Sequence, residues 1–151
     1  PSGFRYIYQM KYLKTWLTTV TYGMRADLAL LILRIGSGLM MMTHGGFKIS
    51  EFSRYAPDFY DFLGLGGEIS LGLTVFAEFF CALLVAAGLM TRIVLVPLIV
   101  LTLVIVFDIH GSDPFGDKEV GLLYLMAYAA LFLSGPGRFA LDHWIWPADK
   151  K

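Results

Sequence analysis

Hydrophobic residues fall into four long stretches separated by short polar segments. The stretches cover residues 28–43, 69–90, 93–109 and 120–133. A helix that crosses a bilayer needs roughly 20 mostly apolar residues. The second stretch meets this length directly, the first and third meet it when their flanks are counted, and the fourth is shorter. The pattern therefore predicts four membrane-spanning helices, the fourth with both ends close to the membrane interfaces.

Composition separates a membrane bundle from a soluble one. Hydrophobic residues make up 57% of the chain and charged residues 16%, whereas soluble domains have roughly 45–50% and about 25%. A soluble four-helix bundle would also carry charges on the outer face of each helix, and these stretches lack such a face. We therefore predict an all-α transmembrane four-helix bundle in residues 26–146.

The two ends of the chain differ from this core. Residues 1–25 interleave aromatic side chains with Arg5, Lys11 and Lys14, a pattern typical of a segment that lies among lipid headgroups. Docking of this segment on a partner subunit explains the pattern equally well. Residues 147–151 form a polar tail.

The distribution of Lys and Arg predicts the orientation. With four spans, both termini lie on one side of the membrane, together with the segment between the second and third spans. That side carries Arg5, Lys11, Lys14, Arg25, Arg92, Arg138, Lys150 and Lys151, and the other side carries Lys48, Arg54 and Lys118. By the positive-inside rule both termini face the cytoplasm, and we expect the membrane to be a bacterial inner membrane.

Charge and cysteine content exclude several function classes. The formal net charge is zero, so no basic face indicates nucleic-acid binding. Cys81 is the single cysteine, which rules out an internal disulfide or a C-x-x-C redox motif within this chain.

Arg34 and Glu78 are the two charges that interrupt the first and second stretches. A charge inside the membrane is costly and marks a functional site by default. At a rise of about 1.5 Å per residue, Arg34 lies about 12 Å and Glu78 about 18 Å from the inner ends of their helices. A long Arg side chain can cover that difference, so we predict that the two residues pair. The pair could serve catalysis, with Glu78 facing a quinol or accepting a proton, or it could only fix the register of the two helices.

The outer ends of the predicted helices carry a second set of candidate residues. His44 and Lys48 lie one turn apart, and Asp108 and His110 end the third stretch. Together with Glu119 they could gather in one shallow pocket and contact a cofactor. Imidazole and carboxylate groups suit several divalent metals, but the spacing imposes no metal geometry, and we assign no metal site. Interfacial histidines hydrated by water and headgroups are the simpler interpretation, and a haem held between His44 and His110 has less support.

A stop signal ends the fourth stretch. Gly135 and Pro136 are typical of a helix C-terminus. Arg138 precedes Asp142 by four residues, which predicts a local ion pair.

Several of these segments together resemble the DoxX family of small four-helix membrane proteins. The resemblance covers about residues 27–143 and rests on motifs whose order and spacing agree. The motifs are Leu-Ile-Leu-Arg-Ile-Gly at 31–36, His-Gly-Gly-Phe-Lys at 44–48, Glu78, Gly-Leu-Met-Thr-Arg at 88–92, and Gly-Pro-Gly-Arg-Phe-Ala-Leu-Asp at 135–142.

This resemblance implies a link to membrane redox systems such as quinol oxidase and thiosulfate:quinone oxidoreductase assemblies, in which such a chain accompanies larger cofactor-bearing subunits. The sequence has no dinucleotide fingerprint and no haem attachment motif of its own. We therefore expect a non-catalytic accessory subunit of a respiratory or other redox complex, with a quinone contact near Arg34 and Glu78. A small transporter or proton pathway using Glu78 and a purely structural subunit are the alternatives.

Overall fold

The computed structural model describes residues 22–146, and every regular element in that range is a helix. Most of the predicted N-terminal segment 1–25 and all of the polar tail 147–151 lie outside the described residues. The elements are α2 (Met24–Ser50), α3 (Phe52–Tyr55), η1 (Ala56–Asp58), η2 (Phe62–Gly64), α4 (Gly67–Val75), η3 (Phe76–Cys81), α5 (Ala82–Ala87), α6 (Thr91–Val104), η4 (Ile105–Ile109), α7 (Phe115–Ser134) and α8 (Leu141–Ile145).

Three continuous helices among the described residues are long and apolar enough to cross a membrane. They are Met24–Ser50, Gly67–Ala87 (α4, η3 and α5) and Thr91–Ile109 (α6 and η4). They cover the first and third predicted stretches completely and residues 69–87 of the second, so the prediction of an all-helical membrane protein is confirmed. The first helix is longer than predicted, because it continues through Gly45 and Gly46 to Ser50.

The fourth predicted stretch lies within α7. This helix has 20 residues and begins after Pro114, whose fixed φ and missing N–H suit a helix start. Asp117, Lys118 and Glu119 occupy its beginning, so its uncharged part is shorter than the three spans above. Gly135 ends it with a φ of 80°, which confirms the predicted stop.

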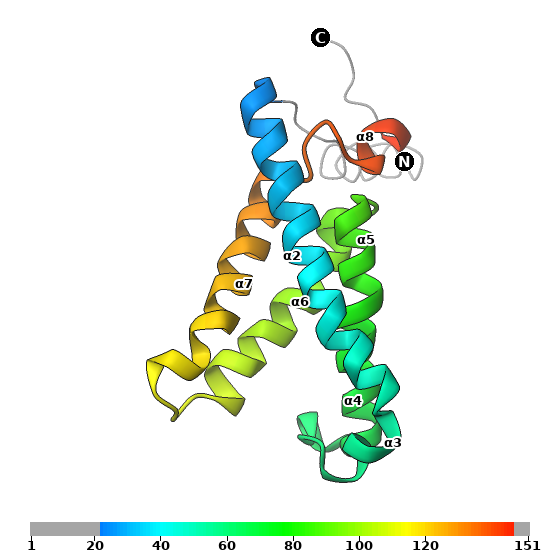
Figure 1. The fold of residues 1–151 in the computed structure, drawn as a ribbon, viewed down its shortest axis with the longest axis vertical. Helices are drawn as coiled ribbons and strands as arrows, with labels where there is room; N and C mark the ends of the chain where they lie inside the picture. Colours follow the sequence, from blue (N-terminus) through cyan, green and yellow to red (C-terminus); the bar gives the residue numbers. More distant parts are fainter. Residues whose placement is uncertain (1–21, 147–151) are drawn as a thin grey trace, which may run out of the picture.

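The helices converge at one end of the bundle and separate toward the other. Figure 1 shows α2, α5 and α7 close together near α8, which we call the C-terminal end. The connections 51–66 and 110–114 lie at the opposite end, which we call the loop end. The strongest packing joins α2 to α5 and η3, and α6 to α7.

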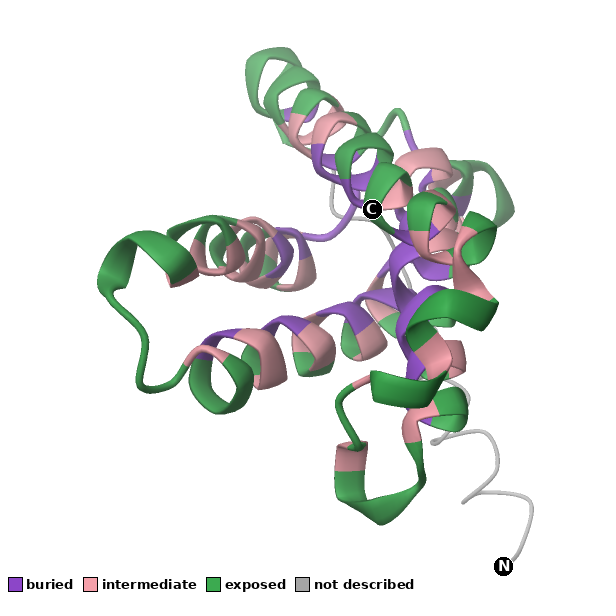
Figure 2. Ribbon diagram, turned by 60° about the horizontal axis from the view of Figure 1, so that its bottom comes forward, coloured by how far each residue is buried: buried purple, intermediate pink, exposed green. Residues whose placement is uncertain are grey.

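Burial follows the inner sides of the helices (Figure 2). The core consists of small and branched apolar side chains, such as Ala82, Val85 and Leu98, around Tyr128. The outward surface is also apolar: Ile32 is 72% exposed, Phe107 65% and Leu133 79%. Large exposed apolar side chains on all outer faces are what lipid contact requires, and they agree with an integral membrane protein.

Two short π-helical turns interrupt the spans. They are η3 in the second helix and η4 at the end of the third. Such turns are rare and occur often at functional sites, because the extra residue in the turn redirects side chains. Here η3 contains Glu78 and η4 contains Asp108. The two turns therefore indicate that a functional site lies near Glu78 and Asp108.

Candidate functional site

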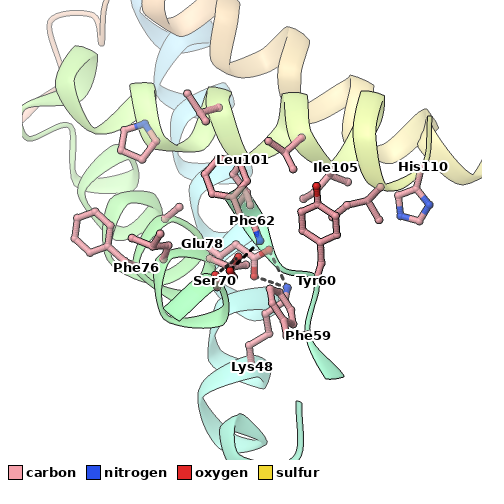
Figure 3. A pocket seen from close by; sticks show the side chains of 17 residues that line it. Lys48, Phe59, Tyr60, Phe62, Ser70, Phe76, Glu78, Leu101, Ile105 and His110 are labelled. Carbon is pink, nitrogen blue, oxygen red and sulfur yellow. Dashed lines mark hydrogen bonds and ion pairs between the residues drawn. The ribbon is translucent and has the colours of Figure 1, made fainter. Parts of the chain in front are cut away.

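The main candidate site is an apolar pocket of about 460 Å³ between the second and third helices. Figure 3 shows Glu78 in its middle, with Phe76 toward one end and His110 at the other. The volume of the pocket is within the range of small-molecule sites, which are mostly apolar and contain a few polar groups that orient the ligand. Its lining comes from α2, the loop-end connection, α4, η3, α6 and η4: Lys48, Phe59, Tyr60, Phe62, Ser70, Leu73, Thr74, Phe76, Ala77, Glu78, Pro97, Val100, Leu101, Val104, Ile105, Ile109 and His110.

An ion pair forms the charged part of the wall. Lys48 Nζ donates to both carboxylate oxygens of Glu78, at 2.8 Å to Oε1 and 2.6 Å to Oε2. The Glu78 side chain is 3% exposed and that of Lys48 is 25% exposed. An ammonium group has three N–H donors and a carboxylate about four acceptor sites. The pair therefore keeps capacity for a further hydrogen-bonding group in the pocket.

A glycine in α2 allows this pairing. A Cβ on Gly45 would lie 2.7 Å from the Phe79 backbone nitrogen and 2.9 Å from the Glu78 carbonyl carbon. Only glycine accepts so close an approach of two helix backbones. Lys48 is three residues later, on the neighbouring turn of the same face. The contact at Gly45 thus brings the backbone of Lys48 close enough for its side chain to reach the Glu78 carboxylate.

The loop-end connection covers one end of the pocket. Tyr60 Oη donates to the Asp108 carboxylate on η4, and the Phe62 backbone N–H donates to Ser70 Oγ at 3.0 Å. The hydrogen bond to Asp108 raises the pKa of the Tyr60 phenol, so the phenol remains a donor at neutral pH. These bonds fasten Phe59, Tyr60 and Phe62 over the loop end of the pocket.

The predicted Arg34–Glu78 pair is not formed. Arg34 Nη2 donates to the Phe139 carbonyl at 3.0 Å, while Glu78 pairs with Lys48. The prediction was wrong because it compared the depths of Arg34 and Glu78 only, while Lys48 had been assigned to the outer side of the membrane. The helix continues to Ser50, and this brings a second cation to Glu78. Arg34 is 2% exposed and is not among the residues that line the pocket.

Arg34 instead belongs to a buried polar cluster at the C-terminal end. Asp142 lies close enough to attract the Arg34 guanidinium electrostatically. The Asp142 carboxylate accepts hydrogen bonds from the Met90 and Thr91 backbone N–H groups, at 2.6 and 2.9 Å, and from Thr91 Oγ1 at 2.7 Å. It therefore caps the start of α6 from a distant part of the chain, where a negative charge also suits the helix dipole.

The predicted local pair between Arg138 and Asp142 is therefore also wrong. The Asp142 carboxylate accepts from α6, while the Arg138 backbone N–H donates to Asp27 Oδ1 at 3.2 Å. The Arg138 guanidinium lies over the Phe139 ring, 5.8 Å from its centroid. The motif 135–142 thus joins α2 to α6 and has a structural role.

The structure brings only some candidate residues of the helix ends together, because Lys48 and His110 line the large pocket and the others do not. His44 lines a smaller cavity beside Lys48, and its ring meets Tyr124 edge to face. His110 pairs with Asp113, Asp108 with Tyr60, and Glu119 is exposed on α7. Within residues 22–146, no three His, Cys, Asp or Glu side chains lie close enough together to hold a metal ion.

The comparison with family models gives a match over residues 29–111, which is more than half of the chain, to the DoxX family. The chain belongs to the DoxX family. Comparison with the curated proteins and with the solved structures gives no match. The matched range contains every residue that lines the large pocket of this DoxX chain. It ends before α7 and the motif 135–142.

The sequence pointed to Glu78, Lys48 and His110 in the DoxX chain, and the aromatic residues of the segment 55–67 predicted a loop that caps the outer mouth, but the individual covering residues were not identified. Phe59, Tyr60 and Phe62 lie in a segment whose aromatic content was evident. Their position over Glu78 depends on the hydrogen bonds of Tyr60 and Phe62, which join residues of the connection to α4 and η4. No spacing rule in the sequence indicates these bonds.

Proposed function

We propose that this DoxX chain is an accessory subunit of a membrane redox complex that binds a quinone in the pocket containing Lys48 and Glu78. The observation that carries the proposal is a buried ion pair on the wall of an otherwise mostly apolar cavity inside a membrane bundle. A quinone is an apolar ring with carbonyl acceptors, and its reduced form has hydroxyl donors. The Lys48 ammonium can donate to the first and the Glu78 carboxylate can accept from the second.

The proposed contact differs from the one expected from the sequence. Glu78 stays in the site, but its cationic partner is Lys48 and Arg34 has no part in it. Arg34 and Asp142 belong to the polar cluster that holds the C-terminal end together. A variant of the ion pair should therefore affect ligand binding, whereas a variant of the cluster should affect folding.

The proposal includes the arrangement in the membrane. We propose that α7 crosses as a fourth span beside α6, with its charged beginning in the interface at the loop end. The loop end then faces outward, and the C-terminal end, with Arg92 and Arg138, faces the cytoplasm of a bacterial cell. The positive-inside rule supports this orientation. Residues 1–25 would then lie at the cytoplasmic headgroups or on the larger subunit.

Quinone binding to the purified chain in nanodiscs tests the site. We expect Glu78→Gln to weaken binding of decylubiquinone at least tenfold, because the amide removes the charge that holds Lys48 in place. A hydrogen bond to a charged group contributes about 1.5–3 kcal/mol, which corresponds to about ten- to hundredfold in affinity. Isothermal titration calorimetry measures the affinity.

Glu119→Gln is the matched control, because it makes the same chemical change on the exposed side of α7. Its affinity should equal that of the unaltered chain. Absence of decylubiquinone binding to the unaltered chain, or equal affinity in all three proteins, would contradict the quinone site. Proton flux through liposomes that contain this chain without quinone would instead favour a proton pathway through Glu78.

Extraction in mild detergent tests the role as a subunit. A larger chain with a redox cofactor is expected to co-purify in a fixed ratio, as judged by absorption spectra and mass spectrometry. Purification of the DoxX chain without such a partner, from actively respiring cells, would count against an accessory role. Because this test does not depend on Glu78, it separates the subunit role from the quinone site.

A further inference from the structure

We infer that the ligand enters the pocket laterally from the bilayer. The ligand is therefore a molecule with an apolar tail, and the tail leaves the pocket between α4–η3 and α6. This inference rests on the proposed quinone site. It adds that the site accepts quinones with an apolar tail and that these quinones reach it through the bilayer. It depends on how polarity and exposure are distributed around the pocket.

Polarity changes along the pocket. The end near α7 contains Tyr60 and His110, and Figure 3 shows both on the opposite side of Glu78 from Phe76. Phe76 lies in the other direction (Figure 3), and apolar side chains such as Leu73 and Val100 make up most of the remaining lining. An amphiphile placed in this gradient has its polar ring at Glu78 and its tail toward Phe76, because apolar surface is most stable away from the charged pair.

The apolar lining is also part of the outer surface. Leu73 is 49% exposed, Phe76 51% and Val100 45%, although all three line the pocket. They lie on two helices that are long and apolar enough to span the membrane, so their exposed sides face lipid. The pocket rim therefore opens toward the hydrocarbon region, and a tail can pass through it without meeting water.

The loop end offers no comparable route. Phe59 and Phe62 lie over it, the Tyr60 hydroxyl is bound to Asp108, and the Phe62 backbone is bound to Ser70. The Gly66 backbone N–H also donates to Asp61 Oδ1 at 2.7 Å, and this bond holds residues 61–66 of the connection in a closed turn. A tailed ligand that entered there would have to break these bonds and cross the aqueous interface.

The test compares two quinones that share a ring, ubiquinone-0 without a tail and decylubiquinone with a ten-carbon tail. Val100→Trp places a large side chain at the rim and is expected to weaken decylubiquinone binding at least tenfold. Ubiquinone-0 needs no exit for a tail, so its affinity should change less than threefold. Binding is measured on the full chain in nanodiscs by quenching of intrinsic fluorescence and, because the variant adds a tryptophan, by calorimetry.

Val96→Trp is the matched control, since Val96 is one turn away on α6, is 47% exposed and does not line the pocket. Leu73→Trp and its control Leu83→Trp repeat the comparison on the second helix, where Leu83 is 43% exposed. If Val100→Trp weakens binding of both quinones equally, or weakens binding of neither, lateral entry is contradicted but the proposed quinone site is not. If the unaltered chain binds neither quinone, the proposed function fails, and the inference fails with it.

Discussion

Replacement of Asp142 by alanine is expected to destabilise the folded chain by at least about 1.5–3 kcal/mol, the contribution of a hydrogen bond to a charged group. Asp142 is 4% exposed and accepts three hydrogen bonds from Met90 and Thr91. Its loss leaves the start of α6 without a cap and the buried Arg34 guanidinium without its attracting carboxylate. Cys81 is the single cysteine and is buried, so its rate of labelling during heating in detergent reports unfolding.

Asp113→Ala is the control for this variant. Asp113 pairs locally with His110, and its side chain is 46% exposed, so its removal should change stability by less than about 0.5 kcal/mol. Asp142→Asn should fall between the two, because the amide keeps an acceptor but loses the charge. Equal melting temperatures for Asp142→Ala and Asp113→Ala would show that the capping network does not hold the C-terminal end.

Gly88→Ala is the second change with a large expected effect. Gly88 has a φ of +74°, and a Cβ there would overlap Arg34 Nη1 and come within 2.7 Å of Ala140 Cβ. Strain in the left-handed region costs about 1–2 kcal/mol. Displacement of Arg34 from its hydrogen bond with Phe139 adds about 1.5–3 kcal/mol, as for other bonds to charged groups. Thermal unfolding followed through Cys81 should therefore show a loss of several kcal/mol.

Gly64→Ala separates the two causes. Gly64 has nearly the same φ, +75°, but a Cβ there meets no atom within 4 Å. This variant should show the backbone strain alone, about 1–2 kcal/mol. If Gly88→Ala and Gly64→Ala lower stability equally, Arg34 does not occupy the space next to Gly88, and the buried position assigned to it is wrong.

Two cations on α2, the buried Arg34 and the half-buried Lys48, explain why the pairing was hard to predict. Arg34 and Lys48 lie on the same helix, but Lys48 pairs with the Glu78 carboxylate and Arg34 donates to the Phe139 carbonyl. Sequence position gave depth along the helix but no information on which helix faces Arg34. The backbone contact at Gly45 and the fold of the motif 135–142 against α2 decided the partners.

Membrane residence, helical class and the approximate limits of the helices follow from the sequence, because apolar length and turn signals are local properties of the chain. The need of Glu78 for a partner follows as well, since an isolated carboxylate in an apolar stretch is costly. The identity of that partner, the aromatic cover and the pocket itself depend on residues far apart in sequence. Only the tertiary structure decided them, because they depend on helix tilt, two π-helical turns and the close approach at Gly45.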